Sequence, residues 1–251
     1  MHRFFAPNLD PGDEVVTLPK DEAEHLTRVL RLGVGDMVSV FDGRGHEFSA
    51  RVIAASRRDA RVQLLSRLAA AEEPSVALTL AQAVIKGEKM DDIVRDAVML
   101  GVAAVQPLVT ARTEATVAQL TNSRRIDRWR RVALASVKQS KRAVLPDVRH
   151  PLTLESFLQD PPNALRLMLV EPGAISGDGV ESVEPVSALQ NEPVPQDATI
   201  FVGPEGGWTD AELSMARYHG VRLLTMGHRT LRADATPVAA ISVLQFLFGD
   251  L

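Results

Sequence analysis

A glycine-rich segment near the end of the chain constrains the fold most strongly. Ala198-Thr199-Ile200-Phe201-Val202 is an apolar run typical of a buried strand, and Thr209-Asp210-Ala211-Glu212 is a capping box that begins a helix. The residues between them, Gly203-Pro204-Glu205-Gly206-Gly207, therefore form a strand-to-helix loop. Such loops at the carboxyl edge of a parallel sheet bind small ligands in α/β proteins, because glycine lets the backbone approach and leaves its amides and carbonyls free.

Two other segments repeat this pattern of an apolar run followed by a glycine turn. One is Leu167-Met168-Leu169-Val170-Glu171-Pro172-Gly173, and the other leads into Met226-Gly227-His228-Arg229-Thr230-Leu231-Arg232. Taken singly, Gly-Pro and Gly-Gly are ordinary turn dipeptides, so the loops could simply connect strands to helices. Taken together, the three turns predict a single ligand site on which they converge.

Composition limits the class of protein. The chain has 251 residues, 45% of them hydrophobic and 24% charged, which fits a globular protein of one or two domains. Cysteine is absent, which excludes disulfides and thiolate chemistry, and the six histidines lack ligand spacing, so we expect no metal. No signal peptide or apolar run of the roughly 20 residues needed for a membrane span is evident, so a cytoplasmic location is expected.

The net charge of -4 conceals a basic segment in the middle of the chain. Between residues 122 and 142 there are eight basic residues and one acidic residue. The spacing predicts a long helix over about 122–143 with Ile126, Trp129, Ala133 and Val137 on its apolar side. A second face carries Arg124, Arg128, Arg131, Lys138 and Arg142. This stripe is either a solvated helix face or a surface that contacts phosphates.

The chain divides at residues 69–74. Before this linker, short strand patterns around one helix at 21–30, with a hairpin turn at 42–45, predict a small β-barrel. After it, strands at 76–84 and 105–109 flank a helix at 89–100, which is a βαβ unit and indicates a parallel sheet. Residues 174–196 are rich in Gly, Pro, Ser and Glu and are expected to form a mobile surface loop.

The two C-terminal glycine motifs closely resemble the SPOUT class of RNA methyltransferases and, within it, the RsmE family. Arg3-Phe4-Phe5 and His25-Leu26 through Val29-Leu30-Arg31 also fit that family, so the resemblance spans essentially the whole chain. It implies an α/β fold with a SPOUT trefoil-knot methyltransferase domain at 74–251, preceded by a PUA-like RNA-binding β-barrel at 1–70. It also implies a homodimer whose site is completed across the interface.

The resemblance implies S-adenosylmethionine as cofactor. The positions that it assigns to cofactor binding are Val170, Glu171, Val202, Gly203, Pro204, Glu205, Gly206, Gly207, Met226, Gly227, Leu231 and Arg232. The implied activity is methylation of N3 of a specific uridine of 16S rRNA in the small ribosomal subunit. Candidate RNA contacts are Arg3, Arg28, Arg31, Arg124, Arg128, Arg131, Lys138, Gln139 and Arg142, of which Gln139 and Arg142 match a family motif expected near the target base.

Arg232 is the candidate catalytic residue. Methylation at N3 removes a weakly acidic proton, so a fixed cation near the uracil oxygens would stabilise the anionic charge that develops. Alternatively, Arg232 is a structural arginine paired with Asp234 or Glu205. Trp208 and Phe5 could stack on a base, but packing is the more ordinary role for both.

The sequence also bears on two other classes of function, a Rossmann-type enzyme and a non-catalytic binding factor. A Rossmann-type enzyme needs G-x-G-x-x-G directly after its first strand, and the sequence contains no such motif. The alternative of a non-catalytic RNA-binding or ribosome-assembly factor with the same fold stays open. The segment Leu231-Arg232-Ala233-Asp234-Ala235-Thr236 favours it, because the family commonly reads Leu-Arg-x-Glu-Thr-Ala there.

Overall fold

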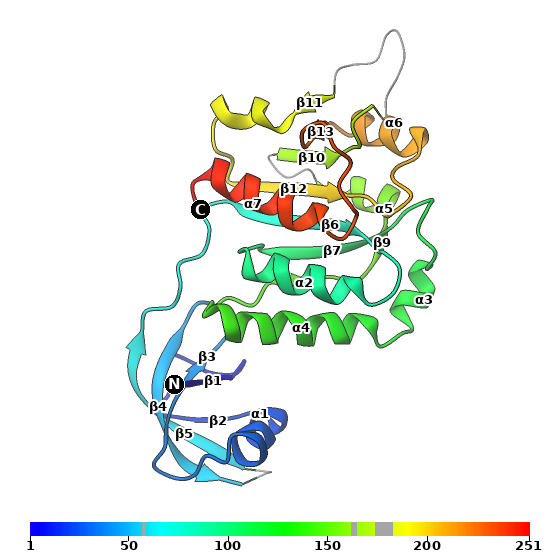
Figure 1. Ribbon diagram of the computed structural model, residues 1–251. Coiled ribbons are helices and arrows are strands. Elements are labelled where there is room, and N and C mark those ends of the chain that lie inside the picture. The colour runs from blue at the N-terminus through cyan, green and yellow to red at the C-terminus, as the bar shows by residue number, and fades with distance from the viewer. Residues whose placement is uncertain (57–58, 162–164, 174–182) are drawn as a thin grey trace. The chain divides into compact units, whose positions relative to one another are not determined.

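The computed structural model describes residues 1–56, 59–161, 165–173 and 183–251 and separates them into two compact units (Figure 1). The first unit comprises Met1–Glu73 and Leu134–Leu145, and the second comprises Pro74–Ala133 and Pro146–Leu251. The first segment of the first unit ends inside the linker predicted at 69–74. Residues 134–145, which the sequence placed with the α/β domain, group instead with the N-terminal strands.

The first unit is built on a five-stranded sheet. Its strand order is β1 (His2–Phe5), β3 (Met37–Phe41), β4 (Glu47–Ala55), β5 (Ala60–Leu68) and β2 (Val15–Thr17). β1 pairs with β3 in parallel, and the other pairs are antiparallel. Gly43 and Gly45 adopt φ values of +78° and +104° in the turn between β3 and β4, which confirms the predicted hairpin. The predicted helix is α1 (Lys20–Glu24), which continues as a π-helical turn over His25–Val29.

The first unit also contains the end of helix α4 (Arg125–Ser140), which the guanidinium of Arg3 caps. Arg3 Nη1 donates to the carbonyls of Val137 and Lys138, both at 2.9 Å, and Nη2 donates to the carbonyl of Arg142 at 2.8 Å. The last carbonyls of a helix have no donor within the helix, so a cation that supplies donors there stabilises the terminus. Arg3 Nε and Nη2 also bind the buried carboxylate of Glu47 at 3.0 and 2.8 Å.

The second unit is an α/β fold around an eight-stranded sheet whose recorded pairings are all parallel. The strand order is β11 (Glu184–Pro185), β13 (Arg222–Thr225), β10 (Leu165–Leu169), β12 (Asp197–Val202), β6 (Ala77–Ala83), β7 (Ala104–Val109) and β8 (Asp147–Val148). β9 (Leu152–Thr153) also pairs with β7. The predicted βαβ unit is confirmed, because β6 and β7 are adjacent and parallel and are joined by α2 (Lys89–Met99).

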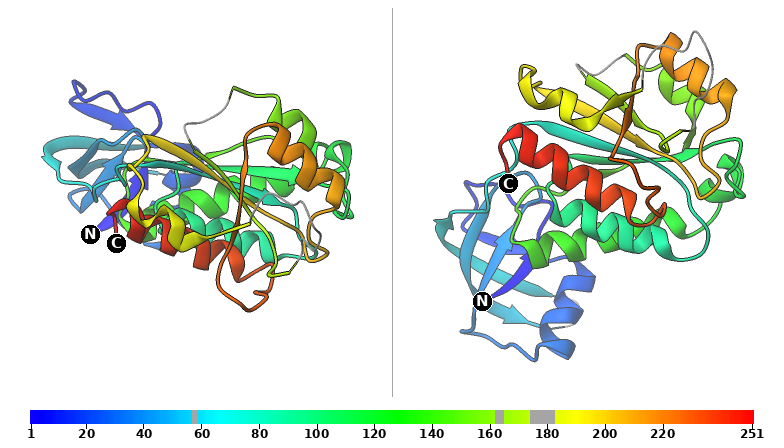
Figure 2. Two further views of the ribbon diagram at one scale, coloured as in Figure 1. Left: turned by 90° about the horizontal axis from the view of Figure 1, so that it is seen from above. Right: turned by 45° about the horizontal axis from the view of Figure 1, so that its top comes forward.

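Helices cover both faces of this sheet (Figure 2). On one face α2 packs against α7 (Thr236–Phe248), which also contacts β12. On the other, α5 (Leu154–Leu158) and α6 (Asp210–Tyr218) pack over a cluster that includes Ala81, Leu108 and Phe201. Within the described residues, no helix is long and apolar enough to cross a membrane.

Two sequence predictions need correction. The long basic helix is shorter than expected: α3 (Val117–Thr121) precedes α4, which ends at Ser140, and Lys141 has φ +64°. The apolar side of α4 was predicted correctly, since all four of its residues are buried. The expected loop at 174–196 contains β11 and a 3-10 helix over Val186–Asn191, and its first part, 174–182, lies outside the described residues.

Candidate functional site

A cavity of about 560 Å³ lies in the second unit, where the glycine turns after β10, β12 and β13 come together. These strands are parallel neighbours in the order β13, β10, β12, so their carboxyl ends share one sheet edge. The predicted convergence of three turns on one site is therefore what the cavity lining shows. We call this cavity the cofactor pocket, because the family resemblance implies that these turns bind a cofactor.

The loop after β12 is shaped around the indole of Trp208. Trp208 is 9% exposed, and its Nε1 donates to the carbonyl of Leu169 at 2.8 Å, so the ring ties the β12 loop to the end of β10. A Cβ at Gly203 would lie 3.2 Å from this ring, and Gly207 adopts φ +69°. Glycine is thus favoured at both positions, by limited space at Gly203 and by backbone conformation at Gly207. Trp208 is a packing residue, and Phe5 packs against Phe41, with ring centroids 5.5 Å apart.

The start of α6 fixes the far end of the same loop. The Thr209 hydroxyl accepts from the Glu212 amide, while Glu212 Oε2 accepts from the Thr209 amide at 2.8 Å, which confirms the predicted capping box. The second oxygen, Oε1, accepts from the amide of Ala111 at 2.8 Å. Because Glu212 is 7% exposed, its carboxylate is a buried link between the loops that follow β12 and β7.

Two cationic side chains from upstream elements complete the pocket. Arg112 lies in the loop after β7 and donates from Nη1 to the carbonyls of Gly206 and Trp208, the latter at 3.1 Å. Lys89, the first residue of α2, forms an ion pair with Asp234 at 3.2 Å. Neither residue was predicted from the sequence. The available signal was their position in segments that follow parallel strands, since Arg112 lies three residues after the end of β7 and Lys89 six residues after the end of β6.

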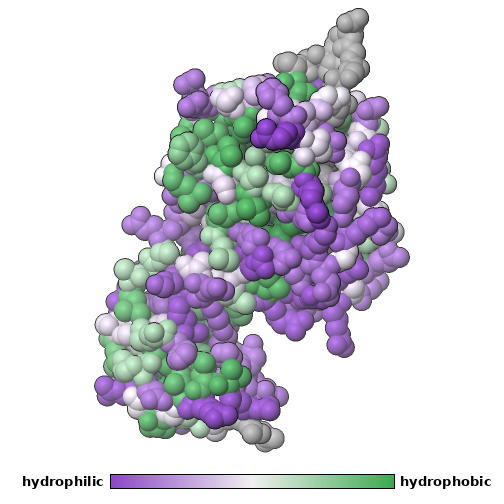
Figure 3. Space-filling model, viewed as in Figure 1, coloured by the Kyte–Doolittle hydropathy of each residue, from purple (hydrophilic) through white to green (hydrophobic). Residues whose placement is uncertain are grey.

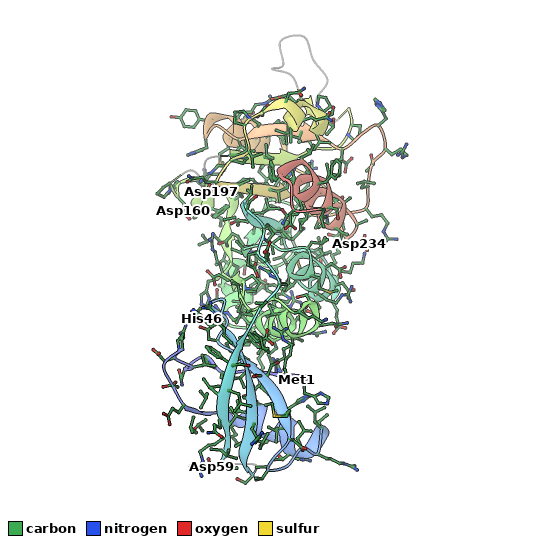
Figure 4. The ribbon with its side chains drawn as sticks, turned by 90° about the vertical axis from the view of Figure 1, so that its left-hand side faces the viewer. Met1, His46, Asp59, Asp160, Asp197 and Asp234 are labelled. Atoms are coloured by element: carbon green, nitrogen blue, oxygen red, sulfur yellow. The ribbon has the colours of Figure 1, made fainter. Side chains whose placement is uncertain are left out.

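The third turn carries the candidate catalytic arginine on the segment that enters α7, two residues before Asp234, which is labelled in Figure 4. Arg232 donates from Nε and Nη2 to the two carboxylate oxygens of Asp234, both at 3.1 Å. A hydrogen bond from Arg232, and to a smaller extent one from Lys89, lowers the pKa of the Asp234 carboxyl. The Arg232 side chain is nevertheless 76% exposed, so its pairing with Asp234 leaves the guanidinium accessible at the pocket.

The predicted cofactor positions gather in this one pocket. All of them are part of its lining except Gly227, which follows Met226 with φ +76°. The lining also contains residues that were not predicted to bind the cofactor: Lys89, Arg112, Leu169, Pro172, Trp208, Asp210, Leu213, Arg229, Thr230, Ala233, Asp234 and Thr236.

The predicted RNA contacts occupy three different environments. Arg28, Arg31, Arg124, Arg131 and Gln139 are exposed. Two others are engaged in ion pairs: Arg128 with Glu88 and Asp91, and Lys138 with the buried Glu22.

Arg3 and Arg142 have structural environments, and neither belongs to an exposed basic stripe. Arg3 caps α4, and Arg142, 5% exposed, bonds from Nε to Glu73 at 3.0 Å. Arg142 departs from the predicted stripe because α4 ends before it and the chain turns at Lys141.

Comparison with known proteins identifies the class to which this fold and pocket belong. Residues 71–245 match the family described as RNA methyltransferase domain, and residues 18–65 match the RNA methyltransferase PUA domain. The chain is therefore an RNA methyltransferase by family, built from a PUA domain and a parallel α/β domain.

Individual relatives narrow this class. Ribosomal RNA small subunit methyltransferase E from Synechocystis is 33% identical over 94% of this chain and 74% of its own. The Neisseria gonorrhoeae protein of the same name, solved with S-adenosylmethionine, is 30% identical, with a TM-score of 0.82 over 98% of both chains. A Legionella pneumophila methyltransferase structure that also contains the cofactor is 28% identical, with a TM-score of 0.85 over 97% and 96% of the two chains. The chain belongs to the ribosomal RNA small subunit methyltransferase E family.

Proposed function

We propose that this protein transfers a methyl group from S-adenosylmethionine to N3 of a specific uridine in 16S rRNA of the small ribosomal subunit. The observation that carries the proposal is the convergence of the three glycine turns on one pocket of about 560 Å³, with Arg232 at its lining. The relatives described above support both the cofactor and the class of substrate. Action on ribosomal subunits also fits a cytoplasmic location.

The residues of the pocket fit S-adenosylmethionine. At Gly203 and Gly206 a Cβ would lie 3.2 Å from Trp208 and 3.1 Å from Arg112, so glycine lets the loop pack closely against these two side chains and keep the shape of the pocket. Glu171, Glu205 and Asp210 supply carboxylates for the ammonium and ribose hydroxyls of the cofactor, and loop backbone groups supply further hydrogen bonds. The cofactor itself supplies an electrophilic methyl group on its sulfonium.

Arg232 is proposed to act on the uracil. The N3 atom lies on the Watson–Crick edge, so the target base must be unpaired or flipped out of a stack. The N3 proton passes to solvent water, and the negative charge that develops spreads to the flanking carbonyl oxygens, where the exposed guanidinium of Arg232 provides preorganised donors. Asp234 is proposed to hold Arg232 in position through its two hydrogen bonds.

The exposed cations are proposed to contact the RNA backbone. In the first unit these are Arg28, within the π-helical turn, and Arg31, just after it. In the second unit they are Arg124, just before α4, and Arg131, on α4. Phosphate neutralisation by such side chains gives affinity that falls with rising salt. Arg3 and Arg142 are excluded from this surface because their donors are used within the first unit.

A homodimer is proposed to form through α7. This helix is apolar around most of its circumference, and its Phe246 is 68% exposed. Met99 on the neighbouring α2 is 45% exposed. Apolar side chains gather over α7 in the surface view (Figure 3). A helix that is hydrophobic on all sides is ordinarily buried, so a second copy of the chain is the expected cover.

The finer architecture is also proposed from the resemblance. The first unit is proposed to be a PUA-like barrel. The second is proposed to contain a trefoil knot, in which the segment from β13 to α7 passes through an earlier loop of the chain. The placement of β13 between β11 and β10, rather than at a sheet edge, supports this reading.

The test is transfer of labelled methyl from S-adenosylmethionine to small subunits that lack uridine-N3 methylation, followed by nucleoside analysis. Product 3-methyluridine supports the proposal, and comparison with protein-free rRNA shows whether assembled subunits are required. If the folded dimer transfers no methyl to either substrate and does not bind the cofactor, the protein is a non-catalytic RNA-binding factor instead.

A further inference from the structure

The first turn of α2 lies between helix α4 and the segment that enters α7 (Figure 1). On one side, Arg128 of α4 forms ion pairs with Glu88 and Asp91. On the other side, Lys89 forms an ion pair with Asp234 at 3.2 Å. All five residues belong to the second unit. A row of charged side chains therefore connects α4 to the cofactor pocket.

Arg128 holds the first turn of α2 at two points. Its Nη1 donates to Glu88 Oε1 at 2.8 Å, and its Nε contacts Asp91 Oδ2. Glu88 and Asp91 are three residues apart and so share one side of the helix, whereas Lys89 is on a different side and lines the cofactor pocket. A contact on one side of this turn thus sets the direction of the lysine on the other.

The first turn of α2 lacks a side-chain cap among the residues that the structure describes. Glu88 occupies the N-cap position, but its carboxylate bonds to Arg128 instead of to an amide of α2. The first amides of a helix have no partners within the helix, so a turn without a cap depends on restraints from outside. Arg128 supplies such a restraint, and the Asp91 side chain that it binds is 19% exposed, which shields the pair from water.

Lys89 and Arg232 meet on one carboxylate at the other end of the row. Lys89 Nζ lies 3.2 Å from Asp234 Oδ2, and Arg232 donates to both carboxylate oxygens of Asp234 at 3.1 Å. Both cations line the cofactor pocket. Movement of Lys89 would therefore shift Asp234 and, with it, the guanidinium of Arg232. A displacement of about 1 Å in a reacting site can cost about 100-fold in rate.

We propose that Arg128 is a positioning residue for methyl transfer that acts through Lys89: Arg128 fixes the first turn of α2, and Lys89 on that turn fixes Asp234 and hence Arg232. The inference rests on the proposed function, because it requires that Arg232 act on the uracil. It also changes the role of Arg128, which the sequence predicted as an RNA contact. An RNA contact acts on substrate affinity, whereas a positioning residue acts on the rate of the bound complex.

Variants of the full-length protein separate these two roles. Arg128→Gln removes both ion pairs to α2, and Arg128→Lys keeps the charge. Lys89→Gln removes the pair with Asp234, and a double variant combines Arg128→Gln with Lys89→Gln. Arg131→Gln is the contrast, because Arg131 is an exposed arginine of α4 that is proposed to contact RNA. Arg95→Gln is the control, because Arg95 pairs with two carboxylates of α2 itself and lies outside the cofactor pocket.

The expected result is a loss of kcat that requires Lys89. Arg128→Gln should lower kcat on small subunits about tenfold, with KM and cofactor affinity within about twofold of wild type. Arg128→Lys should recover part of the rate, because one ammonium can still bind one carboxylate. The double variant should have the kcat of Lys89→Gln, since Arg128 acts through Lys89. Arg131→Gln should instead raise KM, and Arg95→Gln should match wild type.

Two results would overturn the inference. One is an unchanged kcat in Arg128→Gln, and a rise in KM alongside it would make Arg128 an RNA contact. The other is an additive loss of kcat in the double variant, which would mean that Arg128 does not act through Lys89. Thermal unfolding identifies any variant that does not fold, and Arg128→Lys then takes the place of Arg128→Gln in the cycle.

Failure of the proposed function gives a different result. If wild type transfers no methyl, the proposed function fails, and carboxyl-carbon NMR titration of Asp234 decides the inference. Loss of the Lys89 contact should raise the pKa of Asp234 toward 3.8, so Arg128→Gln should raise this pKa as Lys89→Gln does, while Arg95→Gln leaves it as in wild type. An unchanged pKa in Arg128→Gln would overturn the inference.

Discussion

Arg232 and Asp234 form a two-point contact in which Nε and Nη2 of the arginine each lie 3.1 Å from a carboxylate oxygen. The structural role that the sequence left open for Arg232 is therefore present. It does not exclude the proposed catalytic role, because the arginine side chain is 76% exposed while that of Asp234 is 29% exposed. Asp234 also binds Lys89, so one carboxylate orients two cations of the cofactor pocket.

Arg232→Ala should lower kcat about 100-fold or more, the loss that follows removal of one donor to a developing anion. Cofactor affinity should change little, since the pocket is formed mainly by loop backbone. Arg232→Lys should restore only part of the rate, because an ammonium cannot reproduce the planar two-donor contact. The measurements are steady-state methylation of small subunits and calorimetric titration with S-adenosylmethionine. A rate near that of wild type in Arg232→Ala would remove Arg232 from the mechanism.

The Asp234 carboxyl should titrate below its ordinary pKa of 3.8, because hydrogen bonds from Arg232 and Lys89 favour its ionised form. The sign follows from linkage: a lowered folded-state pKa gives a contribution present above pH 3.8 and lost as pH falls through the lowered value. Carboxyl-carbon NMR titration of the wild type measures the pKa. In Arg232→Ala it should move back toward 3.8, and an unchanged value would show that the pair does not form in solution.

Gly203→Ala should disturb the cofactor loop. Its Cβ would lie 3.2 Å from the Trp208 ring, whose hydrogen bond to Leu169 prevents an easy shift. We expect a loss of about 1–3 kcal/mol in the free energy of unfolding, together with weaker cofactor binding. Gly33→Ala is the matched control, because it has open space around its Cβ and no positive φ, and it should behave as wild type. Urea unfolding and cofactor titration provide the comparison, and equal stability of both variants would argue against the crowding.

Glu22 should make the stability of the protein depend on pH. Burial raises the pKa of its carboxyl above the ordinary 4.5, against the opposing hydrogen bond from Lys138, and its Oε2 has no hydrogen-bond partner. The folded state then binds more protons than the unfolded state, so stability falls as pH rises from 4.5 through the raised pKa. Urea unfolding across this range should show the fall in wild type. Glu22→Gln should show less of it, and identical slopes would contradict the assignment.

Arg3→Ala should destabilise the protein by about 3–5 kcal/mol, because it leaves the buried Glu47 without its partner and uncaps the end of α4. Arg28→Ala provides the contrast. Its side chain is exposed, so stability should change by less than about 0.5 kcal/mol while rRNA affinity falls. Thermal unfolding and filter binding to rRNA distinguish the two effects. Equal stability loss in both variants would contradict a structural role specific to Arg3.

Local sequence signals were sufficient for the elements around the pocket. Apolar runs ended by glycine, and the Thr209 and Glu212 capping box, depend on contacts within a few residues, and the structure confirms them. The family resemblance added the positions on the third turn. Lys89 and Arg112 were missed because their only signal, a position after a parallel strand, points to this pocket only once strands distant in sequence align their carboxyl ends.

In the basic segment at 122–142, by contrast, a local sequence pattern gave a wrong prediction. Helical periodicity placed Arg142 with Arg124 and Arg131, but periodicity assumes that the helix continues. The helix ends at Ser140, and Arg142 turns inward to Glu73, a partner 69 residues earlier in the chain. Charge on a predicted helix face is therefore informative only up to the residue at which the helix ends.

Because α4 is divided between the two units, neither unit can be expressed or exchanged as a simple fragment of the chain. The boundary between units falls after Ala133, inside a continuous helix, and residues 134–145 belong with the N-terminal segment. A fragment that begins at Pro74 would retain all of α4 but lose Arg3, which caps the end of that helix. No single cut in the chain releases either unit whole. A gene fusion or domain exchange at the linker would therefore transfer α4 without the N-terminal segment that contains Arg3. We therefore expect the two units to be inherited together in evolution.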